Sequence, residues 1–149
     1  MMKPLVGPFL AGIMLAGSGV TLAHDADVEW IVEPGAENMP FSSAVRVGHL
    51  LFVSGAIGYD SEAQALVEGG IGPETKQTLE NIKATLEANG SSMDQVVKCT
   101  VFLADIAEWA AMNEVYVTFF GNKPARSALG VNGLALGART EIECIAVVD

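Results

Sequence analysis

The sequence predicts a single α+β domain in which two helices cover one face of a sheet. At 149 residues, the chain has a length suited to one hydrophobic core. Short apolar runs of strand length alternate with two longer segments of helical periodicity. Their order is strand, strand, helix, strand, helix, strand, strand. No internal repeat or linker interrupts this order, so one compact unit is expected.

The first strands are expected within residues 44–54. The segment before them, residues 24–37, shows no regular apolar pattern and is expected to be irregular. Residues 44–47 and 50–54 are short apolar runs separated by Gly48 and His49. This separation is typical of a hairpin between two strands.

The first helix is predicted to open at Pro73 and Glu74 and to end at Gly90. Its apolar or small residues fall on one helical face, as expected for a helix that packs against a sheet. These residues are Thr75, Leu79, Ile82 and Leu86. The apolar run Val96–Leu103 then predicts a third strand.

The second helix is predicted to begin near Asp105, because Asp105 and Glu108 resemble a capping box. A stripe of large residues is interpreted as its core-facing side, and Gly121 as its end. The stripe consists of Trp109, Met112, Tyr116 and Phe120. Residues 127–131 and 140–148 supply the last two strands.

Residues 50–53 are apolar at every position. A strand that is apolar throughout is typical of burial on both faces, whereas two helices can cover only one face of the sheet. The second face is therefore expected to pack against another molecule. A homo-oligomer is the simplest source of that partner, and ligand clefts commonly lie between subunits.

Residues 1–23 differ from the rest of the chain. Lys3 carries their only charge, and Thr21, Leu22 and Ala23 offer a small-residue cleavage site. We interpret this segment as a secretory signal peptide, with a membrane anchor or an artefactual start as alternatives. Export predicts a periplasmic or secreted protein without stable membrane association after cleavage. A cytoplasmic location is the alternative.

The chain is acidic, with 8 Lys and Arg against 18 Asp and Glu and a formal net charge of −10. This composition argues against nucleic-acid binding, which rests largely on phosphate neutralisation. Cys99 and Cys144 could form a disulfide in an oxidising compartment. Their spacing cannot decide this, and their positions in apolar, strand-like runs favour two buried small hydrophobes. The cysteines and histidines form no metal-ligand pattern, so no metal is expected.

Arg126 is the strongest candidate for a ligand-binding residue. Only three arginines occur in the chain, and this one enters an apolar, strand-like stretch. The planar guanidinium can grip a carboxylate through two parallel hydrogen bonds, which suggests a small organic acid as ligand. The alternative is a structural ion pair with Glu141 or Glu143.

Several segments in residues 38–149, about three quarters of the chain, match a known family in order and spacing. They are residues 52–55, 77–83, 97–103, 124–127 and 141–147. On these segments the chain resembles the Rid family, reactive intermediate deaminases of YjgF type, also labelled endoribonuclease L-PSP. The domain organisation expected is therefore signal peptide 1–23, irregular segment 24–37 and Rid-like domain 38–149.

The resemblance implies a chorismate-mutase-like, two-layer fold with a mixed sheet. It also implies a homotrimer with helices outside and three clefts between subunits. The implied activity is hydrolysis of enamines and imines derived from amino acids to 2-oxo acids and ammonia. No cofactor is implied.

The resemblance assigns roles to particular residues. Arg126 corresponds to the arginine that binds the substrate carboxylate, and Glu141 to the glutamate that orients the attacking water. Ser54 and the backbone N–H of Gly55 correspond to the strand end that contributes to the pocket.

Two binding positions depart from the family pattern. Phe41 stands where many members have a substrate-facing tyrosine. Ala128 stands where the commonest pattern has a cysteine that acts through its backbone. These departures concern substrate choice more than reaction class.

We therefore expect a 2-iminobutanoate/2-iminopropanoate deaminase-like hydrolase. The principal alternative is a non-catalytic small-ligand-binding or chaperone-like trimer that uses the same cleft. A ribonuclease is disfavoured because no basic patch flanked by aromatic residues is present. Asn113, in the second expected helix, is interpreted as a structural hydrogen-bonding residue.

Overall fold

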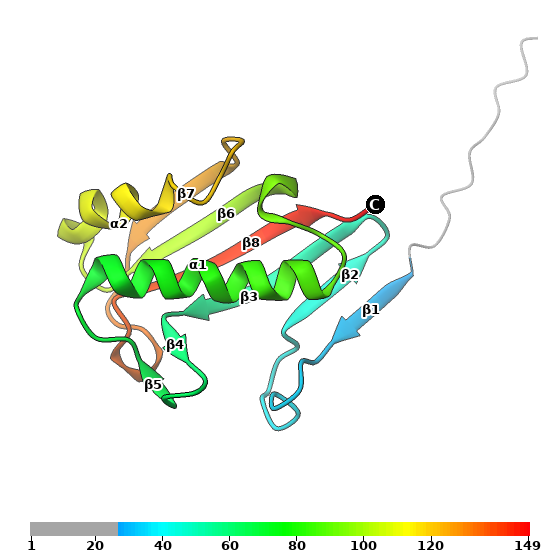
Figure 1. The fold of residues 1–149 in the computed structure, drawn as a ribbon, viewed down its shortest axis with the longest axis horizontal. Helices are drawn as coiled ribbons and strands as arrows, with labels where there is room; N and C mark the ends of the chain where they lie inside the picture. The colour runs from blue at the N-terminus through cyan, green and yellow to red at the C-terminus, as the bar shows by residue number, and fades with distance from the viewer. Residues whose placement is uncertain (1–26) are drawn as a thin grey trace, which may run out of the picture.

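The structure is a computed structural model that describes residues 27–149. Six strands form one sheet in the order β1-β2-β3-β8-β6-β7 (Figure 1). They are β1 (Val28–Ile31), β2 (Ala44–Val47), β3 (Leu50–Ile57), β6 (Val96–Leu103), β7 (Ala125–Gly130) and β8 (Thr140–Val147). Strands β6 and β7 run parallel and the other neighbouring pairs are antiparallel, so the sheet is mixed.

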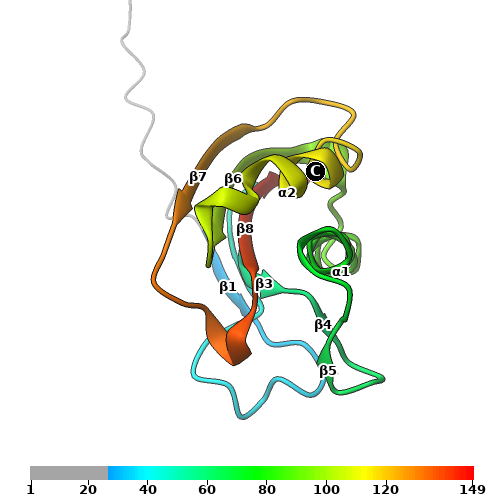
Figure 2. The ribbon, with the colours of Figure 1, turned by 90° about the vertical axis from the view of Figure 1, so that its left-hand side faces the viewer.

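The two helices, α1 (Ile71–Ala88) and α2 (Trp109–Tyr116), lie on the same face of the sheet. Seen edge-on, the sheet forms one curved layer and the helices form the second (Figure 2). A separate two-stranded sheet, β4 (Tyr59–Asp60) and β5 (Ala65–Leu66), precedes α1. This arrangement confirms the predicted α+β class with two helices on one face. The predicted signal peptide, residues 1–23, lies outside the described residues.

Helix α1 packs its predicted apolar face onto the sheet. Leu79, Ile82 and Leu86 are completely buried, as is Thr75. The hydroxyl of Thr75 donates a hydrogen bond to the carbonyl of Ile71 one turn earlier, so the threonine is buried without an unsatisfied donor. The helix ends before Gly90, whose φ of 76° suits a residue without a Cβ.

Helix α2 is shorter than the sequence pattern predicts. Asp105 accepts a hydrogen bond from the N–H of Ala107 and caps a 3₁₀ turn rather than the α-helix itself. Met112 and Tyr116 are buried as expected, whereas Trp109 is 40% exposed. The interpretation of the aromatic stripe as core is therefore wrong for Trp109, because the helix begins there, at the rim of the packed layer.

The expectation that residues 24–37 are irregular is wrong for residues 28–31. These four residues form β1, which pairs antiparallel with β2 and adds an edge strand to the sheet. The strand is short and lies among acidic residues such as Glu29 and Glu33. Its stability comes from pairing with β2, and a local apolar pattern does not report such pairing.

Cys99 and Cys144 form a disulfide between neighbouring strands β6 and β8. Both residues are almost completely buried, which agrees with their interpretation as core residues. The sequence left their pairing open, and the favoured interpretation of two unpaired residues is wrong, because the register places them directly opposite each other.

The other face of the sheet is not covered in a single chain. Leu51 and Val53 are buried, whereas Leu50 and Phe52 are each 39% exposed. Strand β3 is therefore buried on its helix side only. Burial of the opposite side by a partner stays a prediction. Within residues 27–149, neither helix is long and apolar enough to cross a membrane.

Candidate active site

Arg126 lies on edge strand β7 and points toward the helix side of the sheet. It pairs in register with Cys99, whose side chain belongs to the helix-side core. Its Nη1 donates a hydrogen bond of 2.8 Å to Oδ1 of Asn113. Its guanidinium carbon lies 4.6 Å from the ring centre of Tyr116 and 5.3 Å from that of Trp109.

The three partners of Arg126 all come from α2. Trp109, Asn113 and Tyr116 are spaced by four and three residues, which places them on one side of a helix. We call these three residues the arginine-binding face of α2. Aromatic rings next to a guanidinium stabilise its charge through cation–π contacts.

The alternative of a structural ion pair between Arg126 and Glu141 or Glu143 is wrong within a single chain. The ion pairs among residues 27–149 are Arg46 with Glu29 and Arg139 with Glu108. Among residues 27–149, the Arg126 guanidinium donates a hydrogen bond through Nη1, to Asn113. The remaining N–H groups are therefore available to a carboxylate.

Tyr116 supports the guanidinium from inside the core. It is only 5% exposed, and burial raises the pKa of its phenol while the nearby charge of Arg126 lowers it by a smaller amount. The phenol is thus held neutral beneath the arginine. Its hydroxyl has no hydrogen-bond partner among the described residues.

Glu141 lies on β8, in the middle of the sheet, and points to the face away from the helices. Its register partner on β6 is Phe102, which alternates with the core residues Val101 and Leu103. Its carboxylate lies against Gly55: a Cβ at position 55 would overlap Oε1 of Glu141 and lie 3.0 Å from its Cδ. Only glycine allows this close approach.

A bulge in β3 creates the seat for Glu141. Val53 pairs with Cys144 and Ala56 with Ile142, so the strand has one extra residue between these pairs. We call Ser54 and Gly55 the β3 bulge. Ser54 Oγ donates a hydrogen bond of 2.6 Å to the carbonyl of Ser42. This bond ties the bulge to the loop that carries Phe41.

The remaining predicted binding residues lie apart from each other. Phe41 is 55% exposed in the loop between β1 and β2. Ala128 is half-buried on β7, two residues after Arg126, and packs against the core. The structure therefore brings Ser54, Gly55 and Glu141 together and places Arg126 with Ala128 on β7. In one chain it does not bring Arg126 to Glu141, because the two side chains point to opposite faces.

Sequence reasoning missed the role of Trp109 and Tyr116 and underestimated Asn113. Their common helical spacing was the available signal, but the stripe also contains Met112, which is buried in the core. Only the parallel register of β6 and β7 places Arg126 beside this face of α2.

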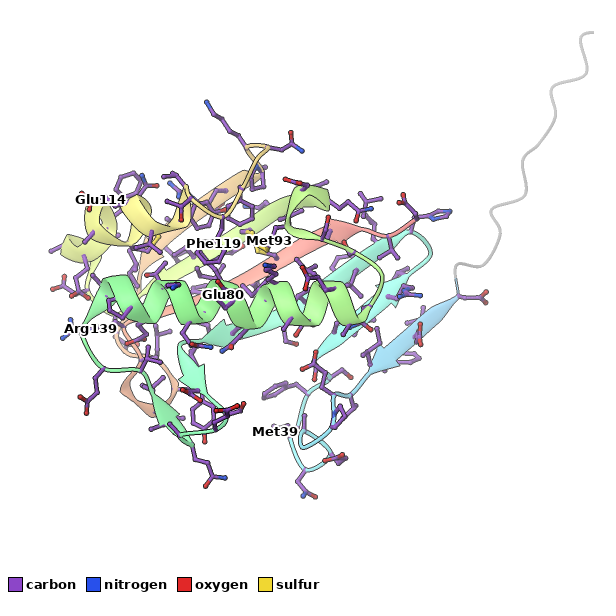
Figure 3. The ribbon with its side chains drawn as sticks, viewed as in Figure 1. Met39, Glu80, Met93, Glu114, Phe119 and Arg139 are labelled. Atoms are coloured by element: carbon purple, nitrogen blue, oxygen red, sulfur yellow. A yellow bond between two sulfur atoms is a disulfide. The ribbon has the colours of Figure 1, made fainter. Side chains whose placement is uncertain are left out.

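Two hollows lie outside these groups. One, of about 320 Å³, lies on the uncovered face of the sheet and is lined in part by Phe52, Lys98 and Glu143. The other, of about 510 Å³, lies over the helix layer, where Figure 3 labels Glu80, Met93 and Phe119. Neither is lined by Arg126 or Glu141. No cluster of three metal-ligating side chains occurs in the described part of the chain.

Comparison with known proteins decides the family. Residues 31–148 match the sequence model of a family described as Endoribonuclease L-PSP. The chain belongs to the Rid family. This assignment confirms the resemblance found in the sequence.

The chain is similar to Rid-family relatives from all three domains of life. It is 47% identical over 108 residues to a RutC family protein of Pyrococcus horikoshii, covering 72% of this chain and 86% of that protein. It is 48% identical over 108 residues to the 2-iminobutanoate/2-iminopropanoate deaminase of Rattus norvegicus, covering 72% and 79%. A solved structure of a Rid protein from Yersinia pestis superposes with a TM-score of 0.77 at 34% identity, covering 82% of this chain and all of that one.

Proposed function

We propose that this protein hydrolyses imines and enamines derived from amino acids, giving 2-oxo acids and ammonia. The observation that carries the proposal is the state of Arg126. Its guanidinium is fixed through Nη1 by Asn113, and its other N–H groups are available to a carboxylate. Mammalian relatives named as 2-iminobutanoate/2-iminopropanoate deaminases, 44–48% identical to this chain, support the reaction type.

The reaction needs little from the protein beyond positioning. Arg126 holds the substrate carboxylate, and Glu141 holds a water molecule against the C=N carbon. The water oxygen bonds to that carbon while the nitrogen gains a proton. The resulting carbinolamine loses ammonia as its hydroxyl gives up a proton, which leaves the 2-oxo acid. An enamine first takes a proton on carbon and gives up one from nitrogen, which converts it to the imine. The proposal requires no metal or cofactor.

We place the complete site between subunits of a homotrimer. Arg126 and Glu141 point to opposite faces of one sheet, so the arginine of one copy must meet the glutamate of another. The uncovered face, with Leu50 and Phe52 partly exposed, offers the surface for such a contact. Phe41, Ser54, Gly55 and Ala128 are proposed to complete the substrate pocket.

Mixing two inactive variants tests this arrangement. We expect Arg126→Lys and Glu141→Gln proteins each to have low activity toward imines generated in situ from alanine. When the two are unfolded, mixed in equal amounts and refolded together, one intersubunit site in four combines the intact arginine with the intact glutamate. Activity should therefore recover to about a quarter of the wild-type value, because each of the two subunits at a site supplies its intact residue with a probability of about one half.

The controls separate the possible outcomes. Each variant refolded alone should keep its low activity. A mixed sample that also stays inactive, although light scattering shows trimers, would place both groups in the same subunit's site. A wild-type protein that binds 2-oxo acids but turns over no imine would favour the alternative, a non-catalytic binding trimer.

We further propose that the protein is exported to the periplasm or secreted, after cleavage behind Ala23. The apolar leader of residues 1–23 supports this location, as does the Cys99–Cys144 disulfide, since disulfides persist mainly in oxidising compartments. Intact mass of the protein from each cell fraction checks the proposal. A full-length, reduced chain recovered from the cytosol would contradict it and favour the cytoplasmic alternative.

A further inference from the structure

The three residues of the arginine-binding face of α2 differ in exposure. Tyr116 is buried in the core, and Asn113 is half-buried and bonded to the arginine. Trp109 contacts the same guanidinium but remains 40% exposed. It is therefore the member of this face that combines contact with Arg126 and a large accessible apolar surface.

The hydrogen bond from Arg126 to Asn113 limits how a carboxylate can bind. The bond to Asn113 uses one of the two N–H groups of Nη1 and fixes the guanidinium, so the edge formed by Nη2 and Nε can take a bidentate carboxylate without breaking this bond. The carbon chain of the ligand must then extend from a carboxylate held within a few ångströms of the guanidinium. The indole of Trp109, 5.3 Å from the guanidinium carbon, lies within reach of the first atoms of that chain.

We propose that Trp109 is a specificity-determining residue of the carboxylate site: its exposed ring forms the wall that the side chain of a bound imino acid contacts. This inference rests on the proposed function. A flat apolar wall favours ligands with aliphatic or aromatic side chains, because contact with the ring removes apolar surface from water. It gives no advantage to ligands as small as the imine of alanine.

Substrate preference tests the inference directly. Imines are generated in situ from alanine and from leucine by an amino-acid oxidase, and their loss is followed for wild type, Trp109→Ala and Trp109→Phe. We expect Trp109→Ala to lower kcat/KM for the leucine imine at least about tenfold more than for the alanine imine, mainly through KM. Trp109→Phe should retain most of the preference.

The control variant is Trp30→Phe. Trp30 is the only other tryptophan of the chain and lies on β1, at the opposite edge of the sheet from Arg126. This variant should keep the wild-type preference. An equal loss on both imines in Trp109→Ala would indicate a structural role and overturn the inference.

Fluorescence separates failure of this inference from failure of the proposed function. In the Trp30→Phe protein, Trp109 is the sole indole, so 4-methyl-2-oxopentanoate should change its emission saturably, and adding Arg126→Lys should weaken that binding. If the fluorescence responds but no imine is hydrolysed, the proposed activity is wrong while Trp109 remains a ligand contact. If imines are hydrolysed without any effect of residue 109 on preference, the inference about Trp109 is wrong.

Discussion

The two halves of the candidate site are built in different ways. Arg126 belongs to an edge strand and is held by side chains of α2, the helix that precedes it in the chain. Glu141 belongs to a central strand and is seated on the backbone of the β3 bulge, far away in sequence. The arginine half depends on side-chain contacts, whereas the glutamate half depends on the absence of a side chain at position 55.

This difference shows how each half tolerates change. The contacts that hold Arg126 can be weakened one at a time, because each of the three α2 side chains contributes only a part of the interaction energy with the guanidinium. The contact between Gly55 and Glu141 cannot be weakened in such steps, because every other residue at position 55 would bring a Cβ against the Glu141 carboxylate. The Cys99–Cys144 disulfide connects the two halves, because Cys99 is the register partner of Arg126 and Cys144 lies on the strand of Glu141.

Removing the disulfide should have the largest effect on stability and should affect both halves together. The cross-link closes a loop with a sequence separation of 45 residues. We expect the Cys99→Ala, Cys144→Ala double variant to lose about 3–4 kcal/mol of unfolding free energy, measured by denaturant titration, because the unfolded chain gains freedom. Wild-type protein unfolded under reducing conditions is the control and should show a similar loss. An unchanged unfolding free energy in the double variant would show that the disulfide does not stabilise the fold.

Gly55→Ala should damage the glutamate half alone. The new Cβ overlaps the carboxylate of Glu141, so we expect a loss of about 1–3 kcal/mol of stability together with most of the imine-hydrolysing activity. Gly72→Ala is the matched control, since a Cβ there meets only Val115 at 3.9 Å within a helical segment. If Gly55→Ala and Gly72→Ala lost the same stability and the same activity, the close contact between Gly55 and Glu141 would not matter for the glutamate half.

Arg126→Lys should damage the arginine half with little change in stability. Lysine keeps the charge but loses the planar fork, so kcat/KM for imine hydrolysis should fall about tenfold to a hundredfold. Arg46→Lys, on β2, tests whether any arginine substitution has this effect. Full activity of Arg126→Lys would show that the site is misassigned. A melting temperature far below that of Arg46→Lys would indicate a structural role instead.

Tyr116→Phe should have the smallest effect near neutral pH. The phenol has no hydrogen-bond partner among the described residues, and phenylalanine keeps the aromatic contact with Arg126. We expect the unfolding free energy to stay unchanged or to rise by up to about 1 kcal/mol. A clear loss of unfolding free energy would mean that the Tyr116 hydroxyl makes a stabilising hydrogen bond in the folded protein.

The same variant should change the response to alkaline pH. Burial raises the folded-state pKa of Tyr116 above its ordinary value of 10.0, so below that pH both folded and unfolded chains carry the neutral phenol. As the pH rises above 10, the unfolded chain loses its proton more readily, and stability falls. Tyr116→Phe should show a shallower fall than wild type in denaturant titrations at pH 9 to 11. A fall as steep as that of wild type in Tyr116→Phe would contradict this assignment.

Most of the fold was predictable, because its signals are local. The strand Val96–Leu103 and the buried face of α1 follow directly from the spacing of apolar residues. Strand β1 was missed because it is four residues long and depends on pairing with β2. The disulfide was considered but could not be decided from the sequence for a related reason: the register that places Cys99 opposite Cys144 joins segments that are distant in sequence.

The candidate site was predictable as a set of residues but not as an arrangement. The motifs identify Arg126 and Glu141, yet nothing in their spacing shows that they point to opposite faces. That fact follows from the alternation of side chains on two strands and their register with β6. The contribution of α2 was equally hidden, because a stripe of aromatic residues predicts a core regardless of what else it touches.

The position of β8 has a consequence for how the protein folds. Among residues 27–149 it is the last strand in sequence order, yet it lies between β3 and β6, which are not neighbours in the sheet. Without β8, the sheet divides into two parts: the strands β1-β2-β3 and a β6-α2-β7 unit. Arg126 can already settle beside α2 in that unit. Insertion of β8 closes the sheet, sets Cys144 opposite Cys99 and places Glu141 against Gly55, so the disulfide and the glutamate half of the site both depend on this one strand.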